Sequence, residues 1–544
     1  MAGLFAKKDL DRLIADANDP NAGEGGGQGG GTLQRHLGAF NLTTLGIGAI
    51  IGAGIFSLTG VAAAQYAGPG IVYSFVIGGI LCALAGLCYA EMAAMVPVAG
   101  SAYAYSYATM GEFVAWIIGW DLVLEYAFGA VTVSVSWSGY LMSLLSKSLG
   151  INFSDTVWRL SKGPWEIAML PDGRQLHGLW NVPASLVAVL VAFVLYKGIK
   201  ESAFANNIIV IIKVTIVLIF ILLGWSVVNH ANWIGDATKT GLASLVPARA
   251  MADIDGVQTM SYGWSGVLTG AGVVFFAYIG FDAVSTTAQE CRNPGKDMPK
   301  GILGSLIVCT VLYILMSLVM TGVVDYHKLN VSDPVAVGID QIVTARHWSP
   351  FAAHTFGGII KLGALAGLTS VILVMMLGQT RVFYAMSKDG LLPWFGTAHK
   401  KFGTPHVATV VTGIFVLICG GIMPMTLVGK LVSIGTLLAF TLVCLGIPIL
   451  RITNPDTPRP FRTPFYWLVS IGGAAACLFV MWGLPKDTWI RLIIWLEAGL
   501  LIYGGYGWQK SRLGGAGREK PHFIILAIAV IALIPTLIWA VKVF

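Results

Sequence analysis

The feature that most constrains this chain is a series of apolar runs that starts after residue 40 and continues almost to the end. A helix of about 20 residues spans the hydrocarbon core of a bilayer. Only 11% of the residues are charged, against about a quarter in soluble domains, and 56% are hydrophobic. The chain is therefore expected to be an all-α integral membrane protein. Its thirteen predicted helices cover 43–61, 71–96, 112–144, 181–198, 204–228, 265–288, 302–325, 356–385, 406–424, 429–450, 466–484, 490–508 and 522–543.

The distribution of lysine and arginine predicts the topology of these helices. Most basic residues fall in short segments on one side, whereas the others are spread over the long loops 145–180, 229–264 and 326–355. Short basic segments stay in the cytoplasm. We expect a multi-pass protein of the inner (plasma) membrane with its N-terminus inside, and thirteen helices then leave Phe544 outside. The net charge of +7 reports this topology, so no nucleic-acid partner is expected.

Several classes of chemistry have no support in the sequence. The seven cysteines include no CxxC pair, none of the nine histidines lies deep in an apolar run, and no Walker A motif occurs. We therefore expect no catalytic residue, no metal site, no cofactor and no enzyme activity. No cleavable signal is visible at the polar N-terminus, and residues 1–35 form a predicted cytoplasmic tail with a Gly-rich linker.

The first apolar helix contains four glycines, at Gly46, Gly48, Gly52 and Gly54. Glycine is a poor helix former, so the helix is expected to unwind around Ala53. Unwinding inside a bilayer frees N–H and C=O groups, which are tolerated only where they line a cavity or bind something. Such a break offers donors to an anion and acceptors to a cation, and a zwitterion has both. The alternative is that the glycines only allow close helix packing.

The sixth apolar helix mirrors the first. Its centre, from Gly270 to Asp282, contains Phe276, Ala277 and Gly280 where unwinding would fall. Interrupted helices at matching places in two halves are typical of inverted repeats in transporters, with the substrate site between them. Because helices one and six are five apart, the pattern predicts two inverted five-helix repeats and favours binding over packing alone.

Several motifs together resemble the amino acid–polyamine–organocation superfamily, and within it the bacterial relatives of the cationic amino acid transporters. The segments that carry the resemblance are Gly46–Phe56, Ala90–Tyr103, Gly119–Tyr126, Phe275–Glu290, Arg292–Pro299 and Gly378–Met386 with Asp389–Gly390. The resemblance runs from about Arg35 to Arg512. The chain departs from the common twelve-helix pattern in its long loops, in the additional helix 522–543, and in Ala53, where some relatives carry Ser or Thr.

The resemblance implies the fold and the task. It places the first inverted repeat in 36–228 and the second in 265–450, with peripheral helices in 466–508 and the additional helix in 522–543. It implies movement of L-amino acids across the lipid bilayer by alternating access. A further expectation is a small membrane partner, or a sterol or lipid contact, near the fifth predicted helix (204–228, helix 5) or the thirteenth (522–543, helix 13).

The resemblance also implies a substrate site at the two breaks. The substrate carboxylate is expected to meet the N–H groups of Ala53 and Gly54, helped by Gly52. The ammonium group is expected to meet backbone carbonyls, and the ring of Phe276 is expected to close over the bound molecule. The carbonyls belong to Ile50, Phe276, Ala277 and Ile279.

Charged residues inside apolar runs are functional candidates. Lys213 lies about ten residues into helix 5, too deep for easy snorkelling, and a lysine at a similar position replaces the sodium ion of related carriers. We expect Lys213 and Glu125 to couple transport to the proton. Alternatively, Glu125 or Asp121 favours a cationic substrate or pairs with Lys213.

Other polar residues receive weaker assignments. Thr369 and Ser370 match hydroxyl ligands of sodium-coupled relatives. Glu91 is expected to be structural, and Glu497 is expected to be peripheral. Glu290 and Arg381 are candidate gate residues or structural ion pairs. The predicted function is a proton-coupled amino acid symporter. The alternatives are an amino acid exchanger, a sodium-coupled carrier and a nutrient receptor on a transporter scaffold.

Overall fold

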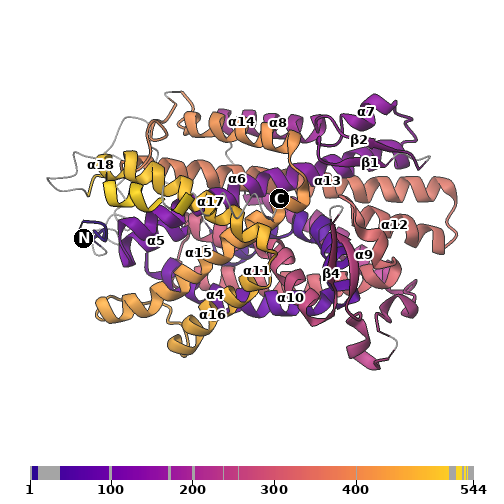
Figure 1. Cartoon of the computed structure of the whole chain (residues 1–544), viewed down its shortest axis with the longest axis horizontal. Helices are drawn as coiled ribbons and strands as arrows, with labels where there is room; N and C mark the ends of the chain where they lie inside the picture. Colours follow the sequence, from indigo (N-terminus) through magenta and orange to yellow (C-terminus); the bar gives the residue numbers. More distant parts are fainter. Residues whose placement is uncertain are drawn as a thin grey trace.

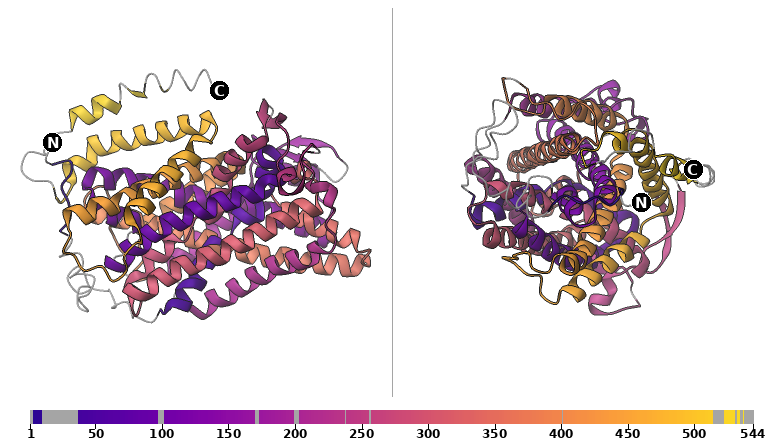
Figure 2. Two further views of the ribbon diagram at one scale, coloured as in Figure 1. Left: turned by 90° about the horizontal axis from the view of Figure 1, so that it is seen from below. Right: turned by 90° about the vertical axis from the view of Figure 1, so that its left-hand side faces the viewer.

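The protein is a bundle of helices that run mainly along the long axis of the molecule (Figure 1). This computed structural model describes residues 3–9, 37–96, 101–169, 173–198, 203–236, 238–254, 257–399, 401–513, 522–529, 532, 533 and 536. In that part of the chain, eight helical stretches are long and apolar enough to cross a membrane, and five shorter apolar helices accompany them. Figure 2 shows the bundle from the side and along its axis. The predicted all-α, multi-pass architecture is confirmed.

Most of the long α-helices follow the predicted apolar runs, and several shorter ones lie between them. They are α2 (Ala39–Ile50), α3 (Thr59–Ala62), α4 (Ile71–Met95), α5 (Ser101–Thr109), α6 (Glu112–Ser143), α7 (Asp155–Arg159), α8 (Val182–Lys197), α9 (Ala203–Trp225), α10 (Gly263–Val274), α11 (Pro294–Val323), α12 (Pro334–Ala345), α13 (Pro350–Lys388), α14 (His406–Ile422), α15 (Met425–Thr453), α16 (Tyr466–Trp482), α17 (Lys486–Ile502) and α18 (Trp508–Lys510).

Shorter helical segments join or interrupt them. The π-helical segments are Gly54–Leu58, Ala63–Ala67, Leu144–Ser148 and Tyr503–Gly507. The 3₁₀ segments are Gly68–Gly70, His230–Trp233, Gly241–Leu245, Phe275–Tyr278, Asp282–Glu290 and Tyr326–Leu329.

The long loops carry structure that hydropathy does not reveal. The loop 145–180 contains the antiparallel hairpin of β1 (Ile167–Met169) and β2 (Gln175–His177). The loop 229–264 contains the hairpin of β3 (Ala250–Ile254) and β4 (Val257–Ser261), and the loop 326–355 contains α12. The β1–β2 hairpin, α7 and α12 lie at the end of the bundle opposite α5 (Figure 1).

The described part of the additional C-terminal helix lies against α17 and the π-helical segment Tyr503–Gly507. Residues 523–529 are helical, and the N–H of His522 donates to the carbonyl of Gly504 at 3.0 Å. The hydroxyl of Thr536 donates to Glu497 at 2.9 Å, so the buried Glu497 is a peripheral docking residue. The described residues of this end therefore pack on α17 and the segment after it rather than on α9, which corresponds to the fifth predicted helix. The predicted outside position of Phe544 lies beyond the described residues.

Helix α6 forms the centre of the bundle. It packs against α8, α13, α14 and α15, and its middle turns are buried on all sides. A membrane helix that is enclosed by others has no lipid-facing stripe, so polar side chains are tolerated along it when they find partners in the protein. Asp121 and Glu125 lie in this enclosed stretch.

Candidate functional site

The first membrane helix is broken at Ile51 and Gly52, just before the predicted position at Ala53, which is already helical. Helix α2 ends at Ile50, and Ile51 has an extended conformation with φ −72° and ψ 98°. The helix resumes at once, because the N–H of Phe56 donates to the carbonyl of Gly52 at 3.1 Å. In the first turn of a helix the N–H groups have no intrahelical acceptor. The N–H groups of Gly52, Ala53 and Gly54 occupy that turn.

The carbonyl end of α2 is held by side chains from two other helices. The ammonium nitrogen of Lys213, in α9, donates to the carbonyl of Gly48 at 2.6 Å. The hydroxyl of Tyr313, in α11, donates to the carbonyl of Ile50 at 2.8 Å. A helix C-terminus carries partial negative charge, so a cation is stabilised there. Lys213 therefore caps the first half of the broken helix.

The sixth membrane helix is broken at the same depth. Helix α10 tightens into the 3₁₀ turn Phe275–Tyr278, after which Ile279 is extended with φ −61° and ψ 136°. Gly280 follows with φ +118°, a conformation that residues with a side chain rarely adopt. A second 3₁₀ segment starts at Asp282. The predicted interruption is confirmed, and Gly280 is its turning point.

The two breaks are in direct contact. A Cβ atom on Gly54 would lie 2.2 Å from the Cα of Ala277, and one on Gly280 would lie 2.8 Å from the carbonyl carbon of Ala49. Both glycines are therefore required for the backbones to approach so closely. The packing and binding interpretations of these glycines are compatible, because close approach sets the two sets of freed backbone groups side by side.

The structure brings the predicted substrate-binding residues together. All seven are buried at the two breaks, but their part in binding stays a prediction. The carbonyl of Ile50 already accepts from Tyr313, and that of Phe276 accepts from the N–H of Ile279 at 3.2 Å. A carbonyl has a second lone pair, so both retain acceptor capacity. The residues are Ile50, Gly52, Ala53, Gly54, Phe276, Ala277 and Ile279.

Lys213 and Glu125, which the sequence groups in one role, have different neighbours. Lys213 is fully buried, and no described carboxylate forms an ion pair with it. Glu125 is also fully buried, and neither of its carboxylate oxygens has a hydrogen-bond partner in the described part of the chain. The alternative in which Glu125 or Asp121 pairs with Lys213 is therefore wrong, because Lys213 reaches a backbone carbonyl. Their roles in coupling stay predictions.

The hydroxyl residues of α13 are already engaged. Thr369 donates to the carbonyl of Leu365 at 2.8 Å and accepts from the ring N–H of Trp137 at 3.0 Å. Ser370 donates to the carbonyl of Gly367 at 2.9 Å. Lys213 packs directly on this helix, since a Cβ atom on Gly367 would lie 3.0 Å from its Cγ. The lysine thus lies between the first break and α13.

The candidate gate residues occupy helix ends. Arg381 is half-buried in the last third of α13, and Glu290 ends the 3₁₀ segment after the second break. The side chain of Glu290 lies outside the described part of the chain. A gate formed by this pair therefore stays a prediction.

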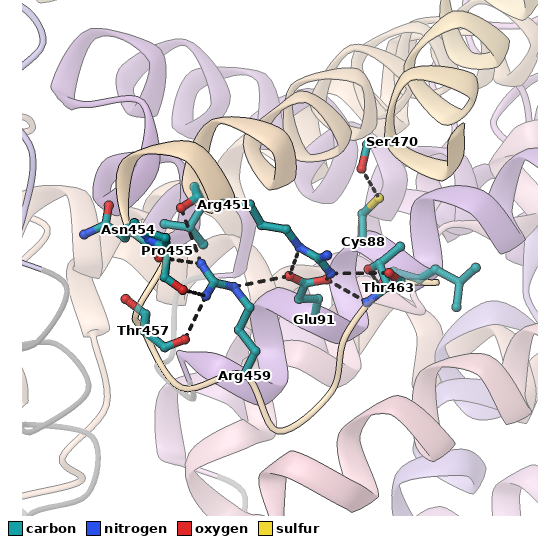
Figure 3. Close-up of polar contacts among 11 residues, drawn as sticks. Cys88, Glu91, Arg451, Asn454, Pro455, Thr457, Arg459, Thr463 and Ser470 are labelled. Atoms are coloured by element: carbon teal, nitrogen blue, oxygen red, sulfur yellow. Dashed lines mark hydrogen bonds and ion pairs between the residues drawn. The ribbon is translucent and has the colours of Figure 1, made fainter. Parts of the chain in front are cut away.

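Glu91 has a structural environment, as expected. This buried carboxylate at the end of α4 accepts two hydrogen bonds from the guanidinium of Arg451, at 3.0 and 2.7 Å. It also accepts from the N–H of Thr463 at 2.7 Å and lies 3.6 Å from Arg459. Figure 3 shows the two arginines converging on Glu91 from α15 and the loop that follows it. This cluster ties α4 to the connection between α15 and α16.

Three tyrosines brace the breaks, and the sequence analysis did not identify them. Besides Tyr313, Tyr140 donates to the carbonyl of Phe56 at 2.6 Å, and Tyr126 donates to the carboxylate of Asp282. A buried tyrosine hydroxyl normally finds a hydrogen-bond partner. A tyrosine within an apolar run is the available signal, but it does not indicate which carbonyl the hydroxyl will reach.

Comparison with known proteins identifies the family to which this chain belongs. Residues 37–500 match the family described as amino acid permease. The chain is 41% identical over 512 residues to the branched-chain amino acid permease BcaP of Bacillus subtilis, which covers 94% of this chain and 99% of that protein. It is 39% identical to the methylthioribose transporter of the same organism, over 94% of this chain and all of that protein.

A plant relative extends the similarity beyond bacteria. The chain is 36% identical over 434 residues to the vacuolar cationic amino acid transporter 2 of Arabidopsis thaliana, covering 78% of this chain and 61% of that protein. Residues 37–500, which match the family model, contain both helix breaks, Lys213 and the Glu91 cluster. This chain belongs to the amino acid permease family of the amino acid–polyamine–organocation superfamily.

Proposed function

We propose that this protein is a proton-coupled amino acid symporter of the plasma membrane that works by alternating access. The observation that carries the proposal is the buried ammonium group of Lys213, which caps the carbonyl end of α2 beside the first break. Amino acid transport is the task of the family to which the chain belongs. The proposal adds coupling to protons, transport in the direction of uptake, and a topology with the N-terminus inside.

The proposed binding mode uses the backbone at both breaks. The carboxylate of the substrate accepts from the N–H groups of Ala53 and Gly54, where the positive end of a helix dipole favours an anion. The ammonium group donates to backbone carbonyls of the set Ile50, Phe276, Ala277 and Ile279. A molecule with both charges satisfies both sets at once. A thio-sugar, the kind of substrate that the name of one relative implies, has neither charge and would leave both sets to other partners.

The proposed coupling step is the making and breaking of one contact. Protonated Lys213 holds α9 and α13 against the first half of the broken helix, which keeps the site complete. A charge-assisted hydrogen bond is roughly twice as strong as a neutral one, so loss of the proton weakens this hold. The two states then differ in a direct interaction, which coupling requires.

Two alternatives use the same site. A sodium-coupled carrier needs oxygen ligands beside the first break. The hydroxyls of Thr369 and Ser370 donate to their own helix, and an ammonium group lies next to them, which is unfavourable for a second cation. An exchanger would use the same breaks without net proton movement. The transport assay separates these alternatives.

The decisive experiment measures uptake of radiolabelled L-leucine into proteoliposomes with imposed pH or sodium gradients. In one-to-one symport, a gradient of one pH unit drives about tenfold accumulation, because about 1.4 kcal/mol corresponds to a factor of ten. Lys213→Met is expected to abolish this accumulation while exchange continues. If L-leucine is not transported, the same assay is repeated with the other common amino acids and with methylthioribose.

A second buried lysine provides the matched control. Lys361 of α13 is only 1% exposed and lies 3.4 Å from Asp340, away from both breaks. Lys361→Met removes an equally buried ammonium group and is expected to keep proton-driven uptake. Accumulation by Lys213→Met on a proton gradient, or by the unaltered protein on a sodium gradient alone, would show that the proposed mechanism is wrong.

A further inference from the structure

A cavity lies beside the last turns of the first membrane helix, at the end of the bundle that carries α12. It has a volume of about 490 Å³, enough for an amino acid with several waters. Its walls come from the end of the first helix, from the long loop 229–264 and from the segment after α11. The lining includes the side chains of Gln65, Ala248, Tyr262, Tyr326, His327 and Asn330.

The long loop 229–264 is anchored so that it forms one wall of this cavity. The hydroxyl of Ser261 donates to the carbonyl of Gln65 at 2.6 Å, and that of Tyr262 donates to the carbonyl of Ala64 at 2.7 Å. Pro247 packs against Gly68, where a Cβ atom would lie 2.4 Å from its ring. These contacts fix the loop on the end of the first membrane helix.

Gln65 lines the cavity and carries an unpartnered acceptor. Its side chain is 2% exposed, and its Nε2 donates to the Oδ1 of Asn330 at 3.3 Å. Its Oε1 is buried and has no hydrogen-bond partner in the described part of the chain. A buried acceptor without a donor costs about 1–3 kcal/mol. A ligand that donates hydrogen bonds here would remove that cost.

Aromatic rings form another part of the cavity lining, and Asp325 precedes one of them in the chain. The rings of Tyr262 and Tyr326 are 5.7 Å apart, and the rings of Tyr326 and His327 are 3.9 Å apart. Burial acts to raise the pKa of Asp325, but hydrogen bonds from His327 outweigh it and hold the pKa below its ordinary value. Asp325 is therefore ionised. Aromatic faces and a carboxylate both attract a cation that also donates hydrogen bonds.

The cavity is separate from the breaks but connected to them. Gln65 is 11 residues after Gly54, which corresponds to roughly 17 Å along a helix. The segment that includes Asn330 runs back along the same helix. Its Ser332 carbonyl accepts from the hydroxyl of Ser57 at 2.6 Å, one turn from the first break. A molecule bound beside Asn330 thus contacts a segment that packs next to the central site.

We propose that this outer cavity is a second binding site, which holds an amino acid by its ammonium group before the molecule reaches the breaks. The inference rests on the proposed function for the identity of the occupant. The ammonium group donates to the Oε1 of Gln65 and lies against the rings of Tyr262 and Tyr326. The site requires a primary ammonium group and does not require a carboxylate.

Thiol protection in the full-length protein tests this site. Ala248→Cys introduces a thiol in the cavity wall, and its rate of labelling by a maleimide is measured with L-leucine, L-leucinamide or 4-methylpentanoate. L-leucine and L-leucinamide carry the ammonium group and are expected to slow labelling about threefold at twice the Kd, by mass action. The carboxylate-only probe is expected to have no effect. Leu242→Cys, exposed on the same loop outside the cavity, is the control and is expected to label equally fast throughout.

Additional variants separate this site from the central one. Protection is expected to persist in Gly54→Val, which alters only the breaks, and to be lost in Gln65→Leu and in Tyr326→Leu. Unprotected labelling with both ammonium probes, protection by 4-methylpentanoate, or loss of protection in Gly54→Val would each overturn the inference. Failure of the unaltered protein to accumulate amino acids would overturn the proposed function and leave the labelling result unchanged.

Discussion

Glu91 and Lys213 are both fully buried charges in membrane helices, yet their surroundings are opposite. Glu91 accepts hydrogen bonds from Arg451 and from the backbone of Thr463, and Arg459 lies close by. Lys213 donates to one neutral carbonyl, that of Gly48. The first charge is balanced and hydrogen-bonded within the protein, whereas the second is stabilised mainly by the negative end of a helix dipole.

This difference separates a structural charge from a functional one. A buried ion pair with good geometry is strongly destabilised when one partner is removed, because the other charge is left uncompensated. Such a group must stay charged throughout. A buried lysine with a neutral partner can lose its proton without leaving an opposite charge unpaired. Only the second arrangement is suited to a group that changes protonation during each transport cycle.

The largest expected effect comes from breaking the balanced cluster. Glu91→Ala leaves Arg451 and the nearly buried Arg459 without their carboxylate, which is expected to cost about 3–5 kcal/mol of stability. The melting temperature of the purified protein in detergent measures this loss. Lys213→Met is the matched control and is expected to stay close to the unaltered protein, because it removes a buried charge that has no charged partner. Equal melting temperatures of Glu91→Ala and the unaltered protein would show that the Glu91 cluster does not stabilise the fold in the expected way.

The next largest effect is expected at the two helix breaks, where backbone groups and not charged side chains are proposed to bind the substrate. Gly54→Val forces its side chain into Ala277, and overpacking of this kind costs about 1–3 kcal/mol. The two breaks must separate, so binding of L-leucine is expected to be lost while the protein stays folded. Gly472→Val has open space around its Cβ position and provides the control. Scintillation proximity binding measures both, and unchanged affinity in Gly54→Val would exclude this site.

A smaller effect is expected at Tyr313, whose neutral hydroxyl binds the same C-terminal end of α2 that Lys213 caps. Tyr313→Phe removes the hydrogen bond to Ile50 and keeps the ring, at a cost of about 1 kcal/mol or a factor of about five. L-leucine affinity is expected to fall by that factor, while the dependence of uptake on the pH gradient is retained. A loss of proton coupling in Tyr313→Phe would contradict the assignment of coupling to Lys213.

The smallest effect is expected at the periphery. Truncation after Lys520 removes the hydrogen bond from Thr536 to Glu497 and exposes the apolar surface of α17 and the segment after it to lipid. Lipid tails are as apolar as the lost helix, so little free energy changes. Uptake by proteoliposomes is expected to stay within about twofold, since a hydrogen bond at the low end of the usual range is worth about 0.5 kcal/mol. Loss of uptake by a folded truncated protein would show that this helix supports the transport cycle.

Much of this architecture is determined locally and can therefore be predicted from the sequence. Long apolar runs become membrane helices because the bilayer requires internally satisfied backbone groups. Gly52 and Gly54 weaken one helix, and Gly280 turns another, because glycine alone adopts the required conformations and close contacts. The positions of both breaks, the depth of Lys213 and the structural part of Glu91 follow from such local rules.

The tertiary structure alone determined which groups meet. Lys213 reaches Gly48 and not Glu125, and Tyr313 reaches Ile50, because these contacts join helices that are far apart in sequence. The hairpin β3–β4 and α12 have no hydropathy signal long enough to identify them. Gln65 in particular reads as an ordinary polar residue at a helix end. Only the folding of loop 229–264 over it leaves its carbonyl oxygen buried and without a donor, because that environment is made by segments nearly 200 residues apart in the chain.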